Sequence, residues 1–507
     1  MAFLQQNTSQ IPMFPYKQSS RPQSLTSIDD LEFERERNRF YDDDLTNPEY
    51  TRQLEKKLVR KLDLLILPMI CAIDFLQFLD KSTINYAAAF TFKQDIDING
   101  TQYSLLGSMF YVGYLVYQIP NNYFLQHVSS VSKYIGTIVF LWGGILVAMA
   151  FGKNFAQMLA MRFLLGMFEA GIYPALTLLV STFYRRSEQV VRLGAFWLCN
   201  GFALFLGGLI AYGIGHIQNP VLHTWQWIML ITGVVTCAMG VVAYFFLIDN
   251  PKSAGLGLNA EFSYLVEERA RDNAVLRTTT FKREQIIEAI KEPRLWYLAI
   301  ATMSLNLQNG AITIYNTQLI ATFGFDSLQA VLLSTGSGLS DIMYILVSVY
   351  VVRTYKNSAL YMAMALMVMD VVGLLLLLLI PVDKLKLIGF YLSWPYAACF
   401  VLILNTIANN VSGFSKKIFY TSVCTVFYSI GNVAGPFFMV ESQKPSYYGA
   451  MIGYCCAGFL CVVCLGLARL WMAKLNKEKE RMQTAEKPRV PLTDITDRED
   501  PYFMYML

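Results

Sequence analysis

The sequence predicts an all-α membrane protein with about twelve transmembrane helices in two six-helix bundles. Its composition is the first reason, because 55% of the 507 residues are hydrophobic and 15% are charged. A mean hydropathy of +0.39 lies outside the range of soluble globular proteins of this length. The second reason is that the apolar residues fall into runs of about 20 residues, the length of a membrane-spanning helix. The third is one long polar connector that divides these runs into two equal groups.

The chain begins with a polar tail, residues 1–60, which lacks the apolar core and cleavage site of a secretory signal peptide. Four basic residues precede the first apolar run: Lys56, Lys57, Arg60 and Lys61. Cytosolic segments of membrane proteins are enriched in Lys and Arg, so we expect the N-terminus in the cytosol.

Two groups of apolar runs follow. The N-terminal bundle, residues 61–250, contains runs at about 64–90, 103–123, 132–151, 157–183, 193–215 and 226–248. After a cytoplasmic linker, residues 251–293, the C-terminal bundle at 294–474 contains runs at about 294–320, 328–352, 359–381, 387–410, 417–440 and 447–473. Residues 475–507 form a charged exit helix and a polar cytoplasmic tail.

Basic residues in every second connection test this count. They are Arg185, Arg186, Arg192, Arg353, Lys356, Lys416, Lys417, Arg469 and Lys474. These connections are all cytoplasmic if the N-terminus is, and the opposite loops carry fewer positive charges. The charge pattern therefore agrees with about twelve spans and two cytoplasmic termini.

The fourth run carries one charge of each sign, Arg162 and Glu169. Seven residues of α-helix turn by about 700°, so both side chains lie on nearly one face, two turns apart. A charge at membrane depth is costly unless it meets a partner or a water-filled cavity. We therefore expect this face to line a polar path, with a structural ion pair as the alternative.

The first run contains Asp80 and Lys81, which are either cavity charges or an ion pair that holds helix ends together. Asp74 lies on nearly the same face as Lys81 and is a further candidate for the cavity. Two more acidic residues, Asp341 and Asp370, lie within later runs, and the sequence assigns them no role.

The seventh run holds several amides, and Asn309 and Asn316 share a face because they are seven residues apart. Polar side chains inside a span commonly mark a substrate or ion path, which makes both candidates for substrate contact. The alternative is interhelical hydrogen bonding, worth about 1 kcal/mol each.

The residue types also exclude several classes of function. A net charge of +4 is too small to indicate nucleic acid binding. Nine cysteines within apolar runs and only three histidines predict no metal centre, no cofactor and no enzymatic nucleophile with its base. The cysteines instead fit small apolar residues packed between helices.

Several motifs in matching order resemble the fungal allantoate permease family, in the anion:cation symporter branch of the major facilitator superfamily. They are FLDKSTINYAAAF at 78–90, RFLLG at 162–166, EAG at 169–171, FYRRSE at 183–188, GNVAGP at 431–436 and LTDITDRED at 492–500. One departure is PNNYFLQH at 120–127, which replaces the superfamily's glycine-aspartate-arginine signature. The gating contacts of that signature cannot be carried over.

The resemblance implies a major facilitator fold and proton-coupled uptake of a small organic anion by alternating access. Glu169 and Asp80 match the positions that serve proton coupling, and Arg162 and Lys81 match those that recognise the anion. Burial favours the protonated form of a carboxylate, and the guanidinium fork suits a carboxylate or sulfonate. Deprotonated Glu169 would compete with the substrate for Arg162, which would couple the two fluxes.

The same resemblance predicts a monomer in the plasma membrane. It implies a substrate such as allantoate, a vitamin acid or a sulfur compound, among which the sequence does not choose. Two alternatives remain at this point: an uncoupled facilitator of the same substrates, which needs no titratable groups, and a nutrient sensor built on a transporter fold.

Overall fold

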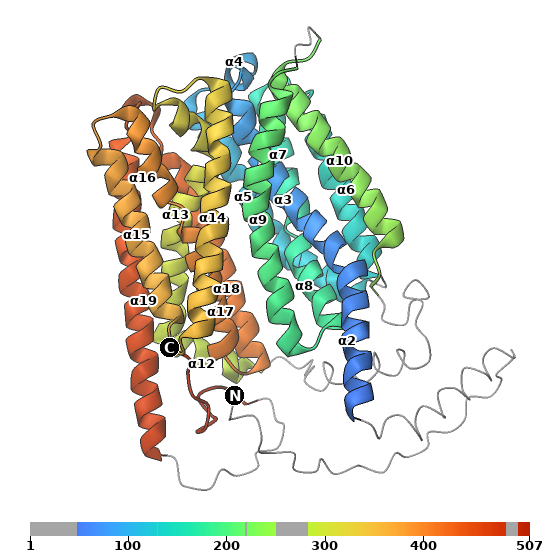
Figure 1. Ribbon diagram of the computed structural model, residues 1–507, viewed down its shortest axis with the longest axis vertical. Helices are drawn as coiled ribbons and strands as arrows, with labels where there is room; N and C mark the ends of the chain where they lie inside the picture. The colour runs from blue at the N-terminus through green and yellow to red at the C-terminus, as the bar shows by residue number, and fades with distance from the viewer. Residues whose placement is uncertain (1–47, 129, 218–220, 250–281, 483–494) are drawn as a thin grey trace, which may run out of the picture.

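A computed structural model describes residues 48–128, 130–217, 221–249, 282–482 and 495–507. Throughout these residues the regular structure is helical, arranged as two bundles that stand side by side (Figure 1). This arrangement confirms the predicted fold class. Residues 1–47 of the predicted tail at 1–60 and most of the predicted linker at 251–293 lie outside the described residues, and the rest of the tail belongs to a helix that begins at Pro48.

The N-terminal bundle is built from the first half of the chain. Its helices are α2 (Pro48–Leu65), α3 (Leu67–Ala88), α4 (Phe92–Asp95), α5 (Gly100–His127), α6 (Val131–Met149), α7 (Phe155–Glu169), α8 (Ile172–Phe183), α9 (Arg186–Ile214) and α10 (Thr224–Phe246). Salt bridges from Arg185 to Glu55 (2.7 Å) and from Arg192 to Asp63 (2.6 Å) hold α2 against the start of α9.

The C-terminal bundle follows the linker. Its α-helices are α12 (Arg283–Lys291), α13 (Pro293–Ala321), α14 (Ser327–Thr354), α15 (Ala359–Leu379), α16 (Lys386–Leu392), α17 (Tyr396–Asn410), α18 (Phe414–Ala434) and α19 (Tyr448–Met482). Three short 3-10 helices complete it: η2 (Asp383–Leu385), η3 (Gly435–Phe438) and η4 (Glu441–Gln443).

Ten segments of the described chain are long and apolar enough to cross a membrane. The predicted spans at 103–123 and 294–320 are not among them, although α5 and α13 have 28 and 29 residues and pack within the bundles. Both helices are more polar because they face the other bundle as well as their own: α5 contacts α18, and α13 contacts α3. Together with these two helices the bundles contain the predicted twelve spans.

Two predicted spans are interrupted, and proline explains both breaks. The fourth span ends as α7 at Glu169 and resumes as α8 at Ile172, since Pro174 removes a donor and crowds the carbonyl four residues earlier. The tenth span is divided into α16 and α17 around Pro395 for the same reason. Polar N-caps start some of the other helices, such as Asn99 before α5, whose side chain accepts from the Gln102 backbone N–H at 2.8 Å.

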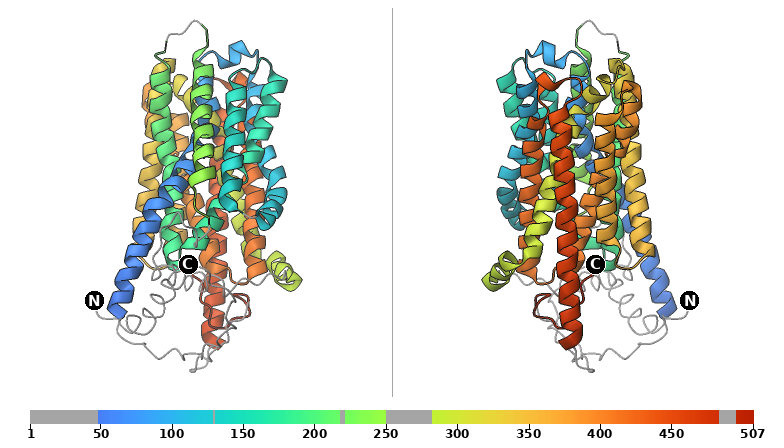
Figure 2. Two further views of the ribbon diagram at one scale, coloured as in Figure 1. Left: turned by 90° about the vertical axis from the view of Figure 1, so that its right-hand side faces the viewer. Right: turned by 90° about the vertical axis from the view of Figure 1, so that its left-hand side faces the viewer.

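The two ends of the molecule differ. At one end, the tail end, α2 begins and the described chain finishes, and both α2 and α19 project beyond the bundles (Figures 1 and 2). The opposite end carries α4 and is called the α4 end. Between the ends α9 and α14 cross so closely that a Cβ on Gly338 would lie 2.4 Å from the backbone nitrogen of Phe205. Glycine at position 338 is therefore required for α9 and α14, and with them the two bundles, to pack this closely.

Candidate functional site

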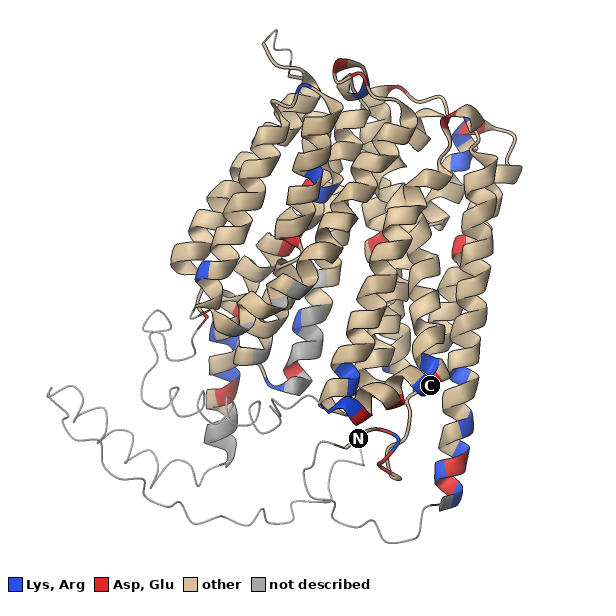
Figure 3. Cartoon of the chain, turned by 180° about the vertical axis from the view of Figure 1, so that it is seen from behind, with Lys and Arg blue, Asp and Glu red and all other residues tan. Residues whose placement is uncertain are grey.

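Few charged residues lie midway along the bundles (Figure 3). Arg162 and Glu169 are both buried residues of α7. Their exposed fractions are 1% and 0%, which agrees with the predicted shared face. They form no ion pair within the described chain: Arg162 Nε and Nη2 and both carboxylate oxygens of Glu169 lack a hydrogen-bond partner there. The structural ion pair considered as an alternative is therefore not formed in this structure.

A glycine sets the position of α7 beside α5. A Cβ on Gly166 would lie 1.9 Å from the carbonyl oxygen of Phe110, so only glycine permits this approach. Gly166 lies between Arg162 and Glu169 on α7. The close contact thus brings the charged face of α7 toward the aromatic residues of α5.

Lys81 lies among those aromatic residues. Its Nζ is 4.8 Å from the ring centre of Tyr111, 5.2 Å from that of Phe78 and 5.9 Å from that of Phe110. Such cation–π contacts stabilise an ammonium that has no carboxylate beside it. Within the described chain Lys81 forms no salt bridge, so its charge is available to an anion.

Asp80 points away from Lys81, as adjacent residues of a helix do. One of its carboxylate oxygens accepts hydrogen bonds from Trp142 Nε1 at 2.7 Å and from Thr236 Oγ1 at 2.6 Å, and the other has no partner in the described chain. The Asp80–Lys81 ion pair is absent. Asp80 is thus held at the α3–α6–α10 contact, a surrounding that the sequence did not indicate.

These four residues nevertheless form one electrostatic group, which we call the charged site. Glu169 interacts electrostatically with Asp80, Lys81 and Arg162. The amide of Gln77 donates to the backbone carbonyl of Glu169 at 3.3 Å and ties α3 to the end of α7. The predicted charges of the first and fourth spans therefore lie within electrostatic reach of one another in the N-terminal bundle.

Asn309 and Asn316 take different neighbours. Asn309 Nδ2 donates to Asn306 and to Asn432 of α18, at 3.0 Å each. Asn316 Nδ2 donates to Ser337 of α14 at 3.0 Å, while its carbonyl oxygen has no partner among the described residues. Interhelical hydrogen bonding accounts for Asn309, and a substrate role for either residue stays a prediction.

Three further acids are buried in the bundles. Asp74 is 1% exposed and Asp370 is 0% exposed, and Asp370 accepts from Gln308 Nε2 at 2.8 Å. Asp341 lies at the crossing of α9 and α14, with one oxygen 3.3 Å from where a Cβ on Gly201 would be. Each of the three keeps one carboxylate oxygen without a partner in the described chain.

Sequence reasoning missed a series of aromatic contacts that we call the aromatic belt: Tyr111, Tyr428, Phe400, Trp197 and Tyr173. Successive ring centres are 6.1, 5.3, 5.5 and 5.7 Å apart. The belt starts beside Lys81 and crosses between the bundles twice, from α5 to α18 and from α17 to α9. Helical spacing could indicate burial of these residues but not their contacts across the bundle interface.

The bundles are joined at the α4 end. In the described chain, hydrogen bonds between the two bundles gather in this half of the molecule. The bonded pairs are Lys93–Gln318, Gly100–Glu441, Gly100–Tyr315, Tyr103–Ile314, Ser104–Tyr315, Ser104–Pro436, Ser108–Val433 and Asn85–Thr317. The α4 end is therefore the closed end of this conformation.

The surroundings of Lys93 predict that this closure depends on pH. Burial and, to a lesser extent, the charge of Lys444 lower the pKa of Lys93 to about 8, against the opposing effect of Glu441. Separation of the bundles would return the lysine to water and to its ordinary pKa of about 10.4. Between these values the closed form binds fewer protons than the separated form, so rising pH favours closure.

We expect each pH unit above about 8 to shift the equilibrium toward closure by up to about tenfold, and the effect to vanish below pH 8. Distances between spin labels on α4 and η4, measured from pH 7 to 10, check this. Lys93→Met should abolish the dependence, whereas the exposed Lys153→Met should preserve it. A pH dependence that survives Lys93→Met would contradict the assignment.

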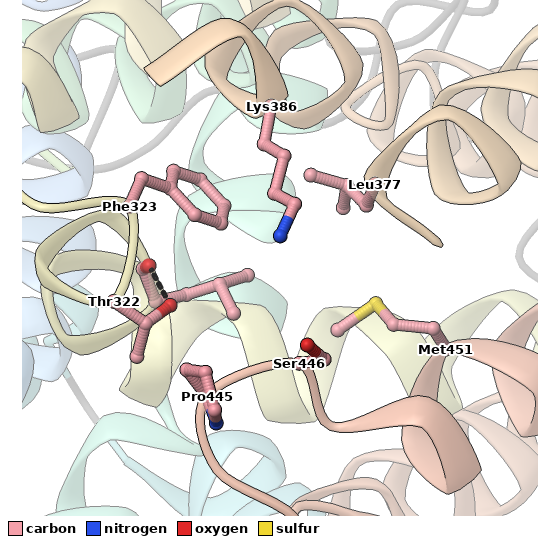
Figure 4. A pocket seen from close by; sticks show the side chains of 8 residues that line it. Thr322, Phe323, Leu377, Lys386, Pro445, Ser446 and Met451 are labelled. Carbon is pink, nitrogen blue, oxygen red and sulfur yellow. Dashed lines mark hydrogen bonds between the residues drawn. The ribbon is translucent and has the colours of Figure 1, made fainter. Parts of the chain in front are cut away.

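The hollows of the surface lie away from the charged site. The pocket in Figure 4 is lined by Phe323, Leu377, Lys386, Pro445 and Met451, among others, and encloses about 10 Å³, barely the room for one water. A larger hollow of about 850 Å³ at the α4 end is lined by residues that include Phe90, Gln94, Gly215, His223 and Ser327. Neither contains a residue of the charged site.

Comparison with known proteins agrees with this geometry. The sequence model of the Major Facilitator Superfamily matches residues 70–436. An uncharacterised transporter of Schizosaccharomyces pombe is 31% identical over 92% of this chain and 89% of its own length. The allantoate permease of Saccharomyces cerevisiae is 28% identical over 90% of this chain and 88% of its own. The thiamine pathway transporter THI73 of the same yeast is 28% identical over 97% of this chain and 92% of its own length.

Solved structures show the same fold. A bacterial homologue of the human lysosomal transporter Spinster, in an inward-facing conformation, has a TM-score of 0.57 at 14% identity and covers 80% of this chain and 95% of its own. The Escherichia coli xylose transporter XylE, partially occluded and inward open, has a TM-score of 0.57 at 12% identity and covers 81% and 98%. The predicted resemblance is thereby confirmed: the chain is a membrane transporter of the Major Facilitator Superfamily, related to the fungal allantoate permease.

Proposed function

We propose that this protein takes up a small, mostly anionic organic nutrient together with protons, across the plasma membrane, by alternating access. The observation that carries the proposal is the buried and unpartnered state of Arg162 and Glu169 on one face of α7. A protein keeps such charges at membrane depth, at a cost in stability, where they act on substrates or ions. Arg162 and Lys81 supply positive charge for the anion, and Glu169 with Asp80 supplies exchangeable protons.

The relatives support an anionic nutrient. Allantoate, named for one of them, is a carboxylate, which a guanidinium binds through two parallel hydrogen bonds. Arg162 has two free nitrogens for such a contact. Lys81, held among aromatic rings, adds a point charge on the neighbouring helix.

The charge distribution supports cytoplasmic termini. Lys and Arg gather toward the tail end (Figure 3), as the positive-inside rule requires of a cytosolic face. With this orientation the closed α4 end is extracellular, as an inward-facing state requires. Uptake would then require the bundles to separate at the α4 end and to close at the tail end.

Coupling follows from competition at the charged site. With Glu169 protonated, Arg162 is free to hold the substrate anion. Loss of the proton toward the cytosol creates a carboxylate that attracts Arg162 and Lys81, and the substrate is released. The empty, deprotonated carrier then returns to the outward-facing state, where Glu169 takes up a new proton from outside.

Uptake measurements test the proposal. Cells expressing the chain would be given radiolabelled allantoate, nicotinate, pantothenate, taurine and cysteine at external pH 5 and pH 7, with and without a protonophore. We expect acid-stimulated, protonophore-sensitive accumulation of at least one acid. Glu169→Gln should abolish accumulation against a gradient and its pH dependence while substrate exchange persists, and the exposed Asp383→Asn should behave as wild type.

An uptake rate that does not change with external pH, with the protonophore or with Glu169→Gln would contradict proton coupling and indicate the uncoupled facilitator. Absence of uptake for the whole panel, with normal surface expression, would contradict the anionic substrate class and favour the sensor.

A further inference from the structure

The end of the chain lies against the tail end of the C-terminal bundle. In this segment, residues 495–507, Thr496 and Asp497 are 0% exposed and Tyr505 is 2% exposed. A terminal segment is poorly ordered unless specific contacts hold it. Burial of this kind therefore requires a binding surface on the bundle.

Asp497 is the polar anchor of the segment. Its Oδ2 accepts from Arg294 Nη2 at 3.0 Å and from the Tyr505 hydroxyl at 2.8 Å. Its Oδ1 is 2.8 Å from Lys416 Nζ and accepts from the Ser412 backbone N–H at 3.2 Å. Burial alone would raise the pKa of Asp497, but the charges of Arg294 and Lys416 outweigh it and hold the pKa below its ordinary value.

Two asparagines of the bundle bind the backbone of the segment. The Asn476 side chain donates to the carbonyl of Tyr505 at 2.9 Å and accepts from its N–H at 2.8 Å. Asn410 pairs in the same way with both backbone groups of Met506. Lys479 Nζ donates to the carbonyls of Asp500 and Phe503 among others. Side-chain amides that hydrogen-bond both backbone groups of a residue are typical of the binding of an extended peptide, and not of the packing of two helices.

The buried positive charges of the surface that binds the segment are fully neutralised only when the segment is present. Lys416 contacts Glu288 at 2.7 Å and Glu292 at 2.5 Å, and Arg294 contacts Glu292 at 2.8 Å. The side chains of Lys416, Arg294 and Glu292 are all fully buried. Without Asp497 two buried cations would share Glu292 and the partly exposed Glu288, and removal of one member of such a network is costly.

We propose that the tail end of the C-terminal bundle is a peptide-binding site, formed by Arg294, Lys416, Asn410 and Asn476, and that residues 495–507 are its built-in ligand. The anchors are Asp497 and Tyr505. Asp497 lies between Arg294 and Lys416, which we call the two-cation hole, and the Tyr505 hydroxyl donates to Asp497. The family model matches residues 70–436, so Arg294, Asn410 and Lys416 lie within the matched part, whereas Asn476 and the segment lie beyond it. It does not depend on the substrate proposed above.

The docked segment also fixes the linker helix. Thr496 Oγ1 donates to Glu288 of α12 at 3.1 Å, and Lys416 holds the same carboxylate. The segment, α12, α18 and α19 therefore form one unit, and α12 moves with the C-terminal bundle. Release of the segment would free α12 and open the two-cation hole to another acidic peptide. A covalent tether keeps the ligand at a high effective concentration, so the docked state is the resting state.

The site can be tested in the folded full-length protein. A protease sequence inserted between residues 483 and 494 would be cut after purification, leaving the segment bound only by its contacts. A fluorescent peptide of residues 495–507 should then exchange into the site, with saturable binding seen as increased anisotropy. The Asp497→Asn peptide should bind at least tenfold more weakly, and an Arg498→Gln peptide, changed outside these contacts, should bind like the original.

Removal of the freed segment by dilution should lower the melting temperature of the cut protein, and added peptide should restore it. Thr496→Glu in the peptide should weaken binding at least tenfold, because a carboxylate would face Glu288. Peptide binding that is absent, or equal for the Asp497→Asn peptide, would overturn the proposal. Exchange that depends on protein concentration in the uncut chain would show that a second copy donates the segment, which would overturn docking within one chain.

Discussion

Arg162→Met is expected to abolish high-affinity substrate binding and at the same time to stabilise the substrate-free protein. Loss of a buried charged hydrogen-bond donor costs about 2–5 kcal/mol of binding, or about 30-fold or more in affinity. The guanidinium has two nitrogens without partners in the described chain and 1% exposure. Replacing an uncompensated buried charge with an apolar side chain of similar length should therefore raise unfolding free energy, by about 1–4 kcal/mol.

In substrate affinity and in stability, Arg162→Lys should lie between the wild type and Arg162→Met, because lysine keeps the charge but lacks the planar guanidinium fork. The control is Arg192→Met at the tail end, where the arginine is paired with Asp63 at 2.6 Å. That change should reduce stability and leave substrate affinity unchanged. Binding assays and thermal unfolding in detergent measure both quantities. A destabilised Arg162→Met protein with normal affinity would assign Arg162 a structural role.

Helix positions were predictable because they depend on local sequence. Apolar length placed the spans, and the polar content of α5 and α13 reflects their location between the bundles. The interruptions at residues 170–171 and 393–395 lie beside prolines, the first about four residues before Pro174 and the second at Pro395 itself. Apolar length alone predicts both spans as continuous, because it does not register a lost hydrogen bond.

The residues of the charged site were predictable, but their partners were not. A spacing of seven placed Arg162 and Glu169 on one buried face. The contact of Asp80 with Trp142 joins residues 62 positions apart, and no periodicity within one helix reports it. The aromatic belt was missed for the same reason, since its contacts cross between bundles. The burial of a residue can be predicted from the pattern of its own segment, whereas a contact depends on how two distant segments pack together.

Lys416 shows the same limit at the tail end. A basic residue between spans ten and eleven counted only as evidence for a cytosolic loop, yet its side chain is fully buried. The explanation is Asp497, which lies far along the chain in a segment that composition describes as a polar tail. A charge pattern predicts the side of the membrane and cannot show whether a particular lysine has a distant partner.

Lys416→Met should therefore destabilise the protein by about 3–5 kcal/mol, because it removes one of the two buried cations that Glu292 and Asp497 share and leaves Arg294 alone to neutralise both carboxylates. The adjacent Lys417 is exposed, so Lys417→Met should change stability by no more than about 0.5 kcal/mol. Thermal unfolding of the two variants in the same detergent makes the comparison, since they remove the same group one residue apart.

A double variant separates charge from packing. If unpaired charge causes the loss, Lys416→Met combined with Asp497→Asn should be more stable than the sum of the two single changes predicts, because the second change removes a carboxylate that the first left exposed to the low dielectric. Coupling of about 1 kcal/mol or more is expected for groups 2.8 Å apart. Strict additivity would mean that Lys416 contributes through its methylene groups, and the two-cation hole would then lose its role as the anchor of the C-terminal segment.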